Sequence, residues 1–231
     1  SDESRGLGDV YKRQVVIDFR TPEGQMQLRH LISDADILIE NFKVGGLAKY
    51  KLDFESLHIL NPRLIYCSIT GFGQTGPYAH RAGYDYILQG MSGLMSVTGD
   101  PNGQPQKVGV AVTDIFSGLY ASTAILAAVN QRHTTGKGQH IDVALFDVAT
   151  AVMANQGMNY LATGTVPERL GNAHPNIVPY AVFDCADGYV IIASGNDGQF
   201  KRLCQLLSIA ADPAYATNSG RLKHRDCLLY T

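Results

Sequence analysis

The feature that most constrains the fold is a short run, Leu64 to Ile69, that is apolar on both faces. A strand of this kind is typical of a parallel sheet that helices cover on both sides. Further strands are predicted at 36–40 and 140–145, and a short β-branched run predicts another at 15–19. Because helical segments alternate with these strands, the pattern predicts an α/β domain with a parallel sheet and right-handed crossovers.

Turn and cap signals mark the remaining elements, and Thr21-Pro22 is predicted to be the N-cap and first residue of a helix. Helices are predicted at 21–31, 53–61, 85–96, 113–132, 147–161 and 197–207. The helix at 113–132 is apolar on most sides and rich in small residues, so we expect it to be buried. A hairpin is predicted from two strands, 180–183 and 189–193, joined by an Asp-Gly turn. We therefore expect a large, Rossmann-like domain at 15–178 and the beginning of a smaller α+β domain at 179–226.

Composition excludes several classes of protein. The chain has 231 residues, 45% of them hydrophobic and 17% charged, as in globular proteins. A net charge of −2 gives no electrostatic footprint for nucleic acid or an anionic membrane. We find no apolar run near the roughly 20 residues of a spanning helix, and no signal peptide. The four cysteines lack metal-ligand spacing, so we expect no metal site, reduced thiols and a cytoplasmic protein.

The two ends of the chain share an unusual relationship. Residues 9–14 read DVYKRQ and residues 227–231 read CLLYT. Written as the codons GAT-GTG-TAT-AAG-AGA-CAG, the first has a reverse complement that contains TGT-CTC-TTA-TAC-ACA, which encodes the second. We interpret both as translated sequencing-library transposon ends. Residues 1–14 and 227–231 are thus expected to be non-native, and residues 15–226 to be an internal fragment of a longer protein.

Gly71, Gly73 and Gly76 formally match the G-x-G-x-x-G fingerprint of dinucleotide-binding proteins. That fingerprint needs a helix that opens at the loop, so that its amides meet the pyrophosphate. Here Pro77 and a polar stretch come before any helical pattern. We therefore interpret the loop as a tight turn and expect no bound NAD or FAD.

Asp147 lies where a predicted strand ends and a predicted helix begins. The positive end of a helix dipole favours a carboxylate there, and an aspartate ionised at neutral pH is available as a nucleophile. A helix N-cap is the alternative interpretation from the residues alone. His174 lies in a loop without apolar periodicity, which suits either a site or an idle surface position. Lys43, Lys49 and Lys51 cluster after the second predicted strand, either at a ligand site or as solvated charges.

Several motifs together resemble class III CoA-transferases, the CaiB/BaiF-like family that includes formyl-CoA transferase and carnitine-CoA transferases. They are ADILIENFKVGGLAKY, NPRLIYCSITGFGQTGPYAHRAGYDYILQGMSGLMSVTG, TGKGQHIDVALFD, GNAHPNIVPY and ADGYVIIASGND, in this order over nearly all of residues 15–226. The family's catalytic aspartate closes the strand after G-x-G-Q. Asp147 stands at that place in this sequence.

The resemblance implies a mechanism and a set of binding residues. In the family the aspartate attacks an acyl-CoA thioester, forming first an aspartyl anhydride and then an aspartyl-CoA thioester. Asn41, Phe42, Lys49 and Phe72 match positions that line the CoA site, with Lys49 placed to meet a CoA phosphate. The segment with Gly171, Asn172 and His174 matches the loop that covers the aspartate. Acyl-CoA and a small carboxylic acid are the implied substrates, without a tightly bound cofactor.

Two other functions stay open beside transfer. The same fold hosts α-methylacyl-CoA racemases, whose catalytic histidine is replaced here by Tyr84. The third reading is a CoA-binding remnant without turnover. The resemblance also implies an interlocked homodimer at full length, which a fragment is not expected to complete, so we expect the fragment itself to be inactive.

Overall fold

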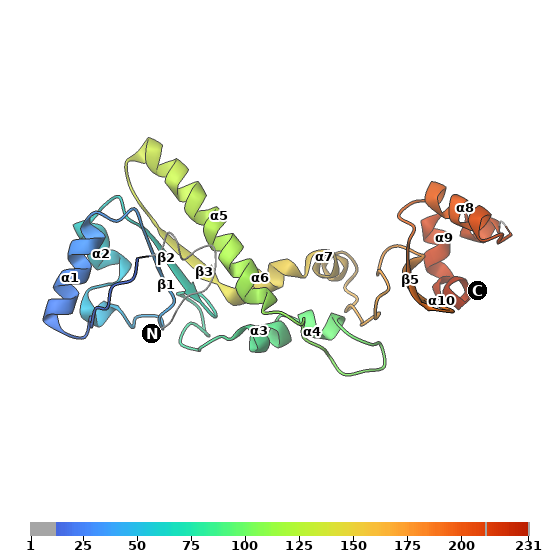
Figure 1. The fold of residues 1–231 in the computed structure, drawn as a ribbon, viewed down its shortest axis with the longest axis horizontal. Helices are drawn as coiled ribbons and strands as arrows, with labels where there is room; N and C mark the ends of the chain where they lie inside the picture. The colour runs from blue at the N-terminus through green and yellow to red at the C-terminus, as the bar shows by residue number, and fades with distance from the viewer. Residues whose placement is uncertain (1–12, 211, 231) are drawn as a thin grey trace. The chain divides into compact units, whose positions relative to one another are not determined.

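A computed structural model describes residues 13–210 and 212–230, which fall into two compact units (Figure 1). The first unit takes its described residues from 13–84 and 113–148. The second contains 85–112 and the described residues from 149 onward. The predicted domain boundary after residue 178 lies within the second unit and stays a prediction.

Three parallel strands form the sheet of the first unit, in the order β1-β2-β3. They are β1 Ile37–Glu40, β2 Ile65–Thr70 and β3 His140–Ala144. Ile37 pairs with Ile65 at one end of β1 and β2, and Thr70 pairs with Ala144 at the other end of β2 and β3. The central strand, β2, has its first four residues buried, as its apolar run predicts. The α/β class with a parallel sheet is confirmed.

Helices pack on this sheet from either side (Figure 1). One face of the sheet is covered by α1 Pro22–Ser33, the 3-10 helix η2 Ala48–Tyr50 and α2 Phe54–Leu60. The other face is covered by α5 Val112–Thr135. The core under α1 and α2 consists of Ile32, Leu52, Leu57, Leu64 and Tyr66. The predicted cap of α1 is confirmed, since Thr21 Oγ1 accepts a hydrogen bond from the Gly24 amide.

The long helix α5 buries one stripe and exposes the rest. Its buried residues follow a spacing of three and four, and are Thr113, Ser117, Ala121, Ile125, Ala128 and Arg132. Leu119 and Leu126 are exposed, so the prediction of burial on most sides is wrong for the described part of the chain. By length and composition α5 also passes as a membrane span, which the sequence prediction missed. Core helices pass the same test; within the described structure, 28% of the apolar window of α5 is buried.

Three other predicted elements differ from the structure. Residues 15–19 form no strand, since they pair with no strand of the described residues and Val16 is fully exposed. The helix predicted at 85–96 is divided into α3 Asp85–Met91 and α4 Leu94–Val97, with Gly93 at φ 91° between them. The helix predicted at 147–161 is divided into α6 Leu145–Val152 and α7 Ala154–Thr163. Ala154 has φ 44° there, which continuous helix does not allow.

The second unit also contains the predicted hairpin, whose strands β4 Tyr180–Cys185 and β5 Gly188–Ala193 pair antiparallel. The helical elements that follow the hairpin are α8 Asp197–Leu206, the 3-10 helix η3 Pro213–Tyr215, α9 Asn218–Lys223 and α10 Arg225–Tyr230. The predicted non-native segment 1–14 lies mostly outside the described residues. Residues 227–230 continue α10, and their assignment as non-native stays a prediction.

Candidate functional site

Parallel pairing brings the chain that follows each of the three strands to one edge of the sheet. Asn41 and Phe42 follow β1, Phe72 follows β2, and Asp147 lies just beyond β3. All four side chains were singled out from the sequence. Open parallel sheets bind their ligands at this carboxyl edge, because loops of different strands converge there.

Asp147 lies in the first turn of α6, which begins at Leu145, so it does not occupy the N-cap. Its side chain is exposed. Among residues 13–210 and 212–230, no hydrogen bond or ion pair engages its carboxylate. The free amides of a helix's first turn favour a negative charge at this place. The carboxylate is thus held beside a fixed backbone and open to attack an electrophile.

The glycine loop after β2 is fastened to the strand and helix that carry Asp147. The amide of Phe146 donates to the carbonyl oxygen of Gly71 over 3.0 Å. The amide of Gln74 donates to Asp142 Oδ2 over 2.8 Å, and that of Gly73 donates to Thr70 Oγ1 over 3.1 Å. No helix opens in this loop, which agrees with its interpretation as a turn.

Glycine is required at the base of this loop. A Cβ atom on Gly71 would lie 2.5 Å from backbone atoms of Gly83, where the loop returns beside the strand end. Gly73 has φ 81°, and a Cβ there would lie 3.3 Å from Asp142 Oδ2. The loop therefore lies directly against the end of the sheet.

Phe72 is half-buried between two aromatic rings of the same unit. Its centroid lies 5.4 Å from that of Tyr78 and 5.8 Å from that of Phe146. Phe146 precedes Asp147 in the chain. Phe72 therefore forms an apolar wall close to the candidate nucleophile, which suits the non-polar part of an acyl-CoA.

A chain of aromatic contacts joins Phe42 to Lys49. The ring centroids of Phe42 and Phe19 lie 5.6 Å apart and those of Phe19 and Tyr50 lie 5.3 Å apart, both in edge-to-face pairs. Lys49 Nζ lies 4.8 Å from the centroid of the Tyr50 ring. The amide of Phe42 also donates to the Glu40 carboxylate over 2.7 Å. These contacts hold two of the predicted CoA-site residues in one cluster.

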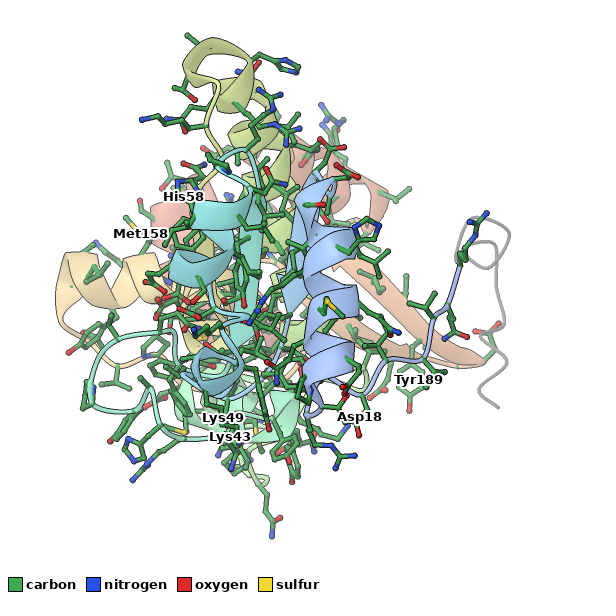
Figure 2. The ribbon with its side chains drawn as sticks, turned by 90° about the vertical axis from the view of Figure 1, so that its left-hand side faces the viewer. Asp18, Lys43, Lys49, His58, Met158 and Tyr189 are labelled. Atoms are coloured by element: carbon green, nitrogen blue, oxygen red, sulfur yellow. The ribbon has the colours of Figure 1, made fainter. Side chains whose placement is uncertain are left out.

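Lys43 and Lys49 lie toward one end of this unit, and His58, at the far end of α2, lies toward the other (Figure 2). Lys43, Lys49 and Lys51 are all exposed. None of their amino groups forms an ion pair with a described residue. The end of the unit that carries Asn41 and Phe42 thus offers several free ammonium groups to an anion.

Cys67, on β2, has a buried thiol whose pKa is shifted by its surroundings. Burial raises the pKa of Cys67 to about 11, and the carboxylates of Glu40 and Asp142 contribute in the same direction. Cys67 is therefore a protonated core residue, and we assign it no part in the chemistry. No cluster of His, Cys, Asp and Glu suited to a metal ion occurs in the described parts of the chain.

The loop with Gly171, Asn172 and His174 belongs to the second unit, so the structure groups it separately from Asp147. The Gly171 amide donates to the Gly99 carbonyl over 3.1 Å. Nδ1 of His174 accepts a hydrogen bond from the Asn176 amide over 3.0 Å. Gly171 and Asn172 are exposed at the apex.

Side chains from two helices hold the segment after this apex. Arg225 Nη2 donates to the carbonyl oxygens of His174 and Pro175 over 3.0 and 2.8 Å. Asn218 donates to the Asn176 carbonyl over 2.8 Å, and Arg221 Nε donates to the Val178 carbonyl over 2.6 Å. These contacts give the loop a fixed base, which the sequence did not indicate.

Sequence analysis did not identify Asp142 as a residue of the site. The structure shows that it is paired with a loop amide, as described above. The available signal was weak, because alternation along β3 shows only that Asp142 faces away from the buried side. Its partner is distant in sequence, so only the strand register brings the two together.

These features define a class of protein: an α/β protein in which an exposed aspartate lies in the first turn of a helix, at the carboxyl edge of a parallel sheet, where such sheets bind ligands. A family model, CoA-transferase family III, matches residues 11–230. The chain belongs to this family, as its motifs predicted.

Three relatives place the chain within the family. A succinate–glutarate CoA-transferase of Agrobacterium fabrum is 63% identical over 93% of this chain and 54% of its own length. A succinyl-CoA:glutarate CoA-transferase of Mus musculus is 41% identical over 93% of this chain and 50% of its own. A crystal structure of a CaiB/BaiF family protein from Brucella suis has 59% identity and a TM-score of 0.79, covering 94% and 58% of the two chains. The chain thus spans about half the length of these curated relatives.

Proposed function

We propose that this protein, at the full length of its relatives, transfers coenzyme A from an acyl-CoA to a carboxylic acid. The observation that carries this proposal is Asp147, an exposed carboxylate at the sheet's ligand edge in a member of CoA-transferase family III. Relatives named for succinate and glutarate support a four- or five-carbon dicarboxylate pair as substrates. Succinyl-CoA as donor and glutarate as acceptor are the substrates to test first.

In the proposed reaction Asp147 supplies the nucleophile. A carboxylate oxygen attacks the donor's thioester carbon, the C–S bond breaks, and CoA leaves as a thiolate. The thiolate attacks the aspartyl carbon of the resulting anhydride, which releases the donor acid and leaves an aspartyl-CoA thioester. The acceptor carboxylate attacks this thioester and frees CoA again, and the thiolate then takes the acceptor's acyl group from the second anhydride. Covalent catalysis divides one difficult exchange into steps of similar difficulty.

The remaining site residues have binding roles in this proposal. Phe72 lies beside Phe146 and forms an apolar surface for the pantetheine or acyl chain. Asn41 and Phe42 form the neighbouring wall, and Lys49 pairs with a phosphate of CoA. By the family resemblance, the loop of Gly171 and Asn172 is proposed to donate to the oxyanion that develops at the thioester, with the Asn172 amide as the candidate donor because the Gly171 amide donates to Gly99 here. No resident cofactor is needed. The full-length protein is proposed to be a cytoplasmic homodimer.

The deciding experiment uses the full-length protein, succinyl-CoA and glutarate. Product acyl-CoA is followed by mass spectrometry, together with the mass of the protein. We expect glutaryl-CoA to form and a covalent CoA adduct to accumulate on the peptide containing Asp147. Asp147→Asn is expected to abolish both while CoA binding persists. Asp34→Asn is the matched control, since Asp34 is an exposed aspartate whose carboxylate contacts no described residue.

The alternatives predict different results in the same assay. A racemase gives no glutaryl-CoA but incorporates deuterium at the α-carbon of a branched acyl-CoA. A binding remnant binds CoA and gives neither product. Transfer by Asp147→Asn at the wild-type rate would show that another group is the nucleophile. Tyr84, which is exposed, disfavours the racemase because phenol is a far weaker base than imidazole at neutral pH.

A further inference from the structure

Asp142 forms a contact that the proposed chemistry leaves unexplained. It lies on β3, five positions before Asp147, and its side chain is exposed. Its Oδ2 accepts the Gln74 amide over 2.8 Å, across a long separation in sequence. An exposed strand carboxylate normally faces water, so this contact with a loop amide is a specific feature of the site.

Three hydrogen bonds fix the loop Gly71–Gln74 at this edge, and Asp142 supplies the only charged acceptor among them. Thr70 accepts from the amide of Gly73, and Gly71 accepts from the amide of Phe146. The first contact fixes the loop to β2, the second to α6, and that of Asp142 to β3. Phe72 lies within this fixed segment and contacts Phe146, the neighbour of Asp147.

The geometry points to Asp142 as a positioning residue that sets the place of Phe72 relative to Asp147. This inference rests on the proposed function, in which Phe72 contacts the acyl-CoA and Asp147 attacks it. Without the Asp142 acceptor, the Gln74 amide loses its partner, and the loop keeps only the bonds of Gly71 and Gly73. Phe72 is then held less firmly, and CoA binding weakens because part of the loop must be ordered at each encounter.

The test uses the full-length protein and three variants, Asp142→Ala, Asp142→Asn and Asp34→Ala. Asparagine retains an oxygen that accepts the Gln74 amide, alanine removes it, and Asp34 is the exposed control. Three quantities are measured for each protein: hydrogen exchange of the peptide covering residues 71–78, the KM and kcat with succinyl-CoA, and the midpoint of thermal unfolding.

We expect Asp142→Ala to speed exchange at the Gln74 amide and to raise KM about three- to tenfold, the loss of one charge-assisted hydrogen bond. The kcat is expected to change less than KM, and the unfolding midpoint to stay close to wild type. Asp142→Asn should restore both exchange and KM, and Asp34→Ala should match wild type.

A second pair of variants tests the same contact from the loop side. Gly73→Ala places a Cβ 3.3 Å from Asp142 Oδ2, whereas Gly76→Ala, at φ 92° in the same loop, meets nothing within 4 Å. Both carry the strain of a positive φ, so the difference between them reports the crowding of the new Cβ against Asp142 and, at 3.4 Å, against the Cβ of Ala144. We expect faster exchange at Gln74 in Gly73→Ala than in Gly76→Ala.

Unchanged exchange in Asp142→Ala, or an unchanged KM despite faster exchange, would overturn the inference. Equal KM for the alanine and asparagine variants, with KM raised in both, would also overturn it. If wild-type protein transfers no CoA, the proposed function fails. The Kd for CoA then replaces KM, and exchange still decides whether Asp142 holds the loop.

Discussion

Arg132 and Asp36 form an ion pair whose two members lie in different surroundings. Nη2 of Arg132 lies 2.8 Å from the Asp36 carboxylate, and the two side chains are 8% and 77% exposed. Nη1 of the same guanidinium donates to the carbonyl oxygens of Asp36 and Arg63 over 3.2 and 3.0 Å. Arg132 thus joins the end of α5 to the segments that enter β1 and β2, at the edge opposite Asp147.

Arg132→Met is expected to destabilise the first unit by about 1.5–3 kcal/mol, because the hydrogen bonds from its buried, charged guanidinium to the carbonyls of Asp36 and Arg63 are lost. Asp36→Ala removes only the exposed partner and is expected to cost less than about 1 kcal/mol. Urea unfolding of both variants measures the contrast. Equal losses would show that the ion pair, and not the carbonyl contacts, gives Arg132 its effect.

The hydrogen bond from Ser56 to the Asp53 carboxylate is expected to make a pH-dependent contribution to the stability of the fold. Burial alone raises the pKa of Asp53, but hydrogen bonds, led by that from Ser56 Oγ over 2.7 Å, outweigh it and lower the pKa. A lowered pKa in the folded state means that the stabilisation is complete above the unfolded value, about 3.9, and is lost as the pH falls through the folded value.

Ser56→Ala should therefore lower the unfolding free energy by about 0.5–1 kcal/mol at pH 7. The deficit is expected to shrink as the pH falls from 7 through the lowered pKa of Asp53, because the carboxyl then becomes protonated in both proteins. Urea titrations at pH 7 and at a series of lower pH values measure it. A deficit independent of pH would assign the effect to the serine alone.

Because Cys67 is buried and Cys185 is exposed, we expect their thiols to differ in reactivity. Since burial raises its pKa to about 11, it is a protonated, inaccessible thiol at pH 8. Iodoacetamide reacts with thiolates, so Cys67 should remain unmodified while the exposed Cys185 is alkylated. Peptide mass spectrometry after timed labelling measures both, and labelling in urea should remove the difference. Rapid labelling of Cys67 in the native protein would contradict its place in the core.

Arg225 is predicted to hold the loop of the second unit. Arg225→Ala removes the donors to His174 and Pro175 and should speed hydrogen exchange in residues 171–178. Lys223→Ala changes an exposed residue at the end of α9; it is the control and should not change exchange. Equal exchange in the two variants would show that Asn218 and Arg221 suffice to order the loop.

Local patterns predicted most of the elements and two of their details. The continuous apolar run of β2 indicated a strand buried on both faces, and Thr21-Pro22 marked the start of α1. The errors share one cause, which is that a local pattern does not report its partners. Val15 and Val16 have β-branched side chains but no strand to pair with, and α5 exposes Leu119 and Leu126 despite its apolar composition.

The sequence by itself determined the family, the alternation of strands and helices, and the identity of the candidate nucleophile, since each depends on residues close together in the chain. Only the tertiary structure decided that Asp142 receives the Gln74 amide, that Phe72 lies against Phe146, and that Arg225 holds the carbonyls after His174. Such contacts depend on strand register and helix packing, which the whole chain sets together.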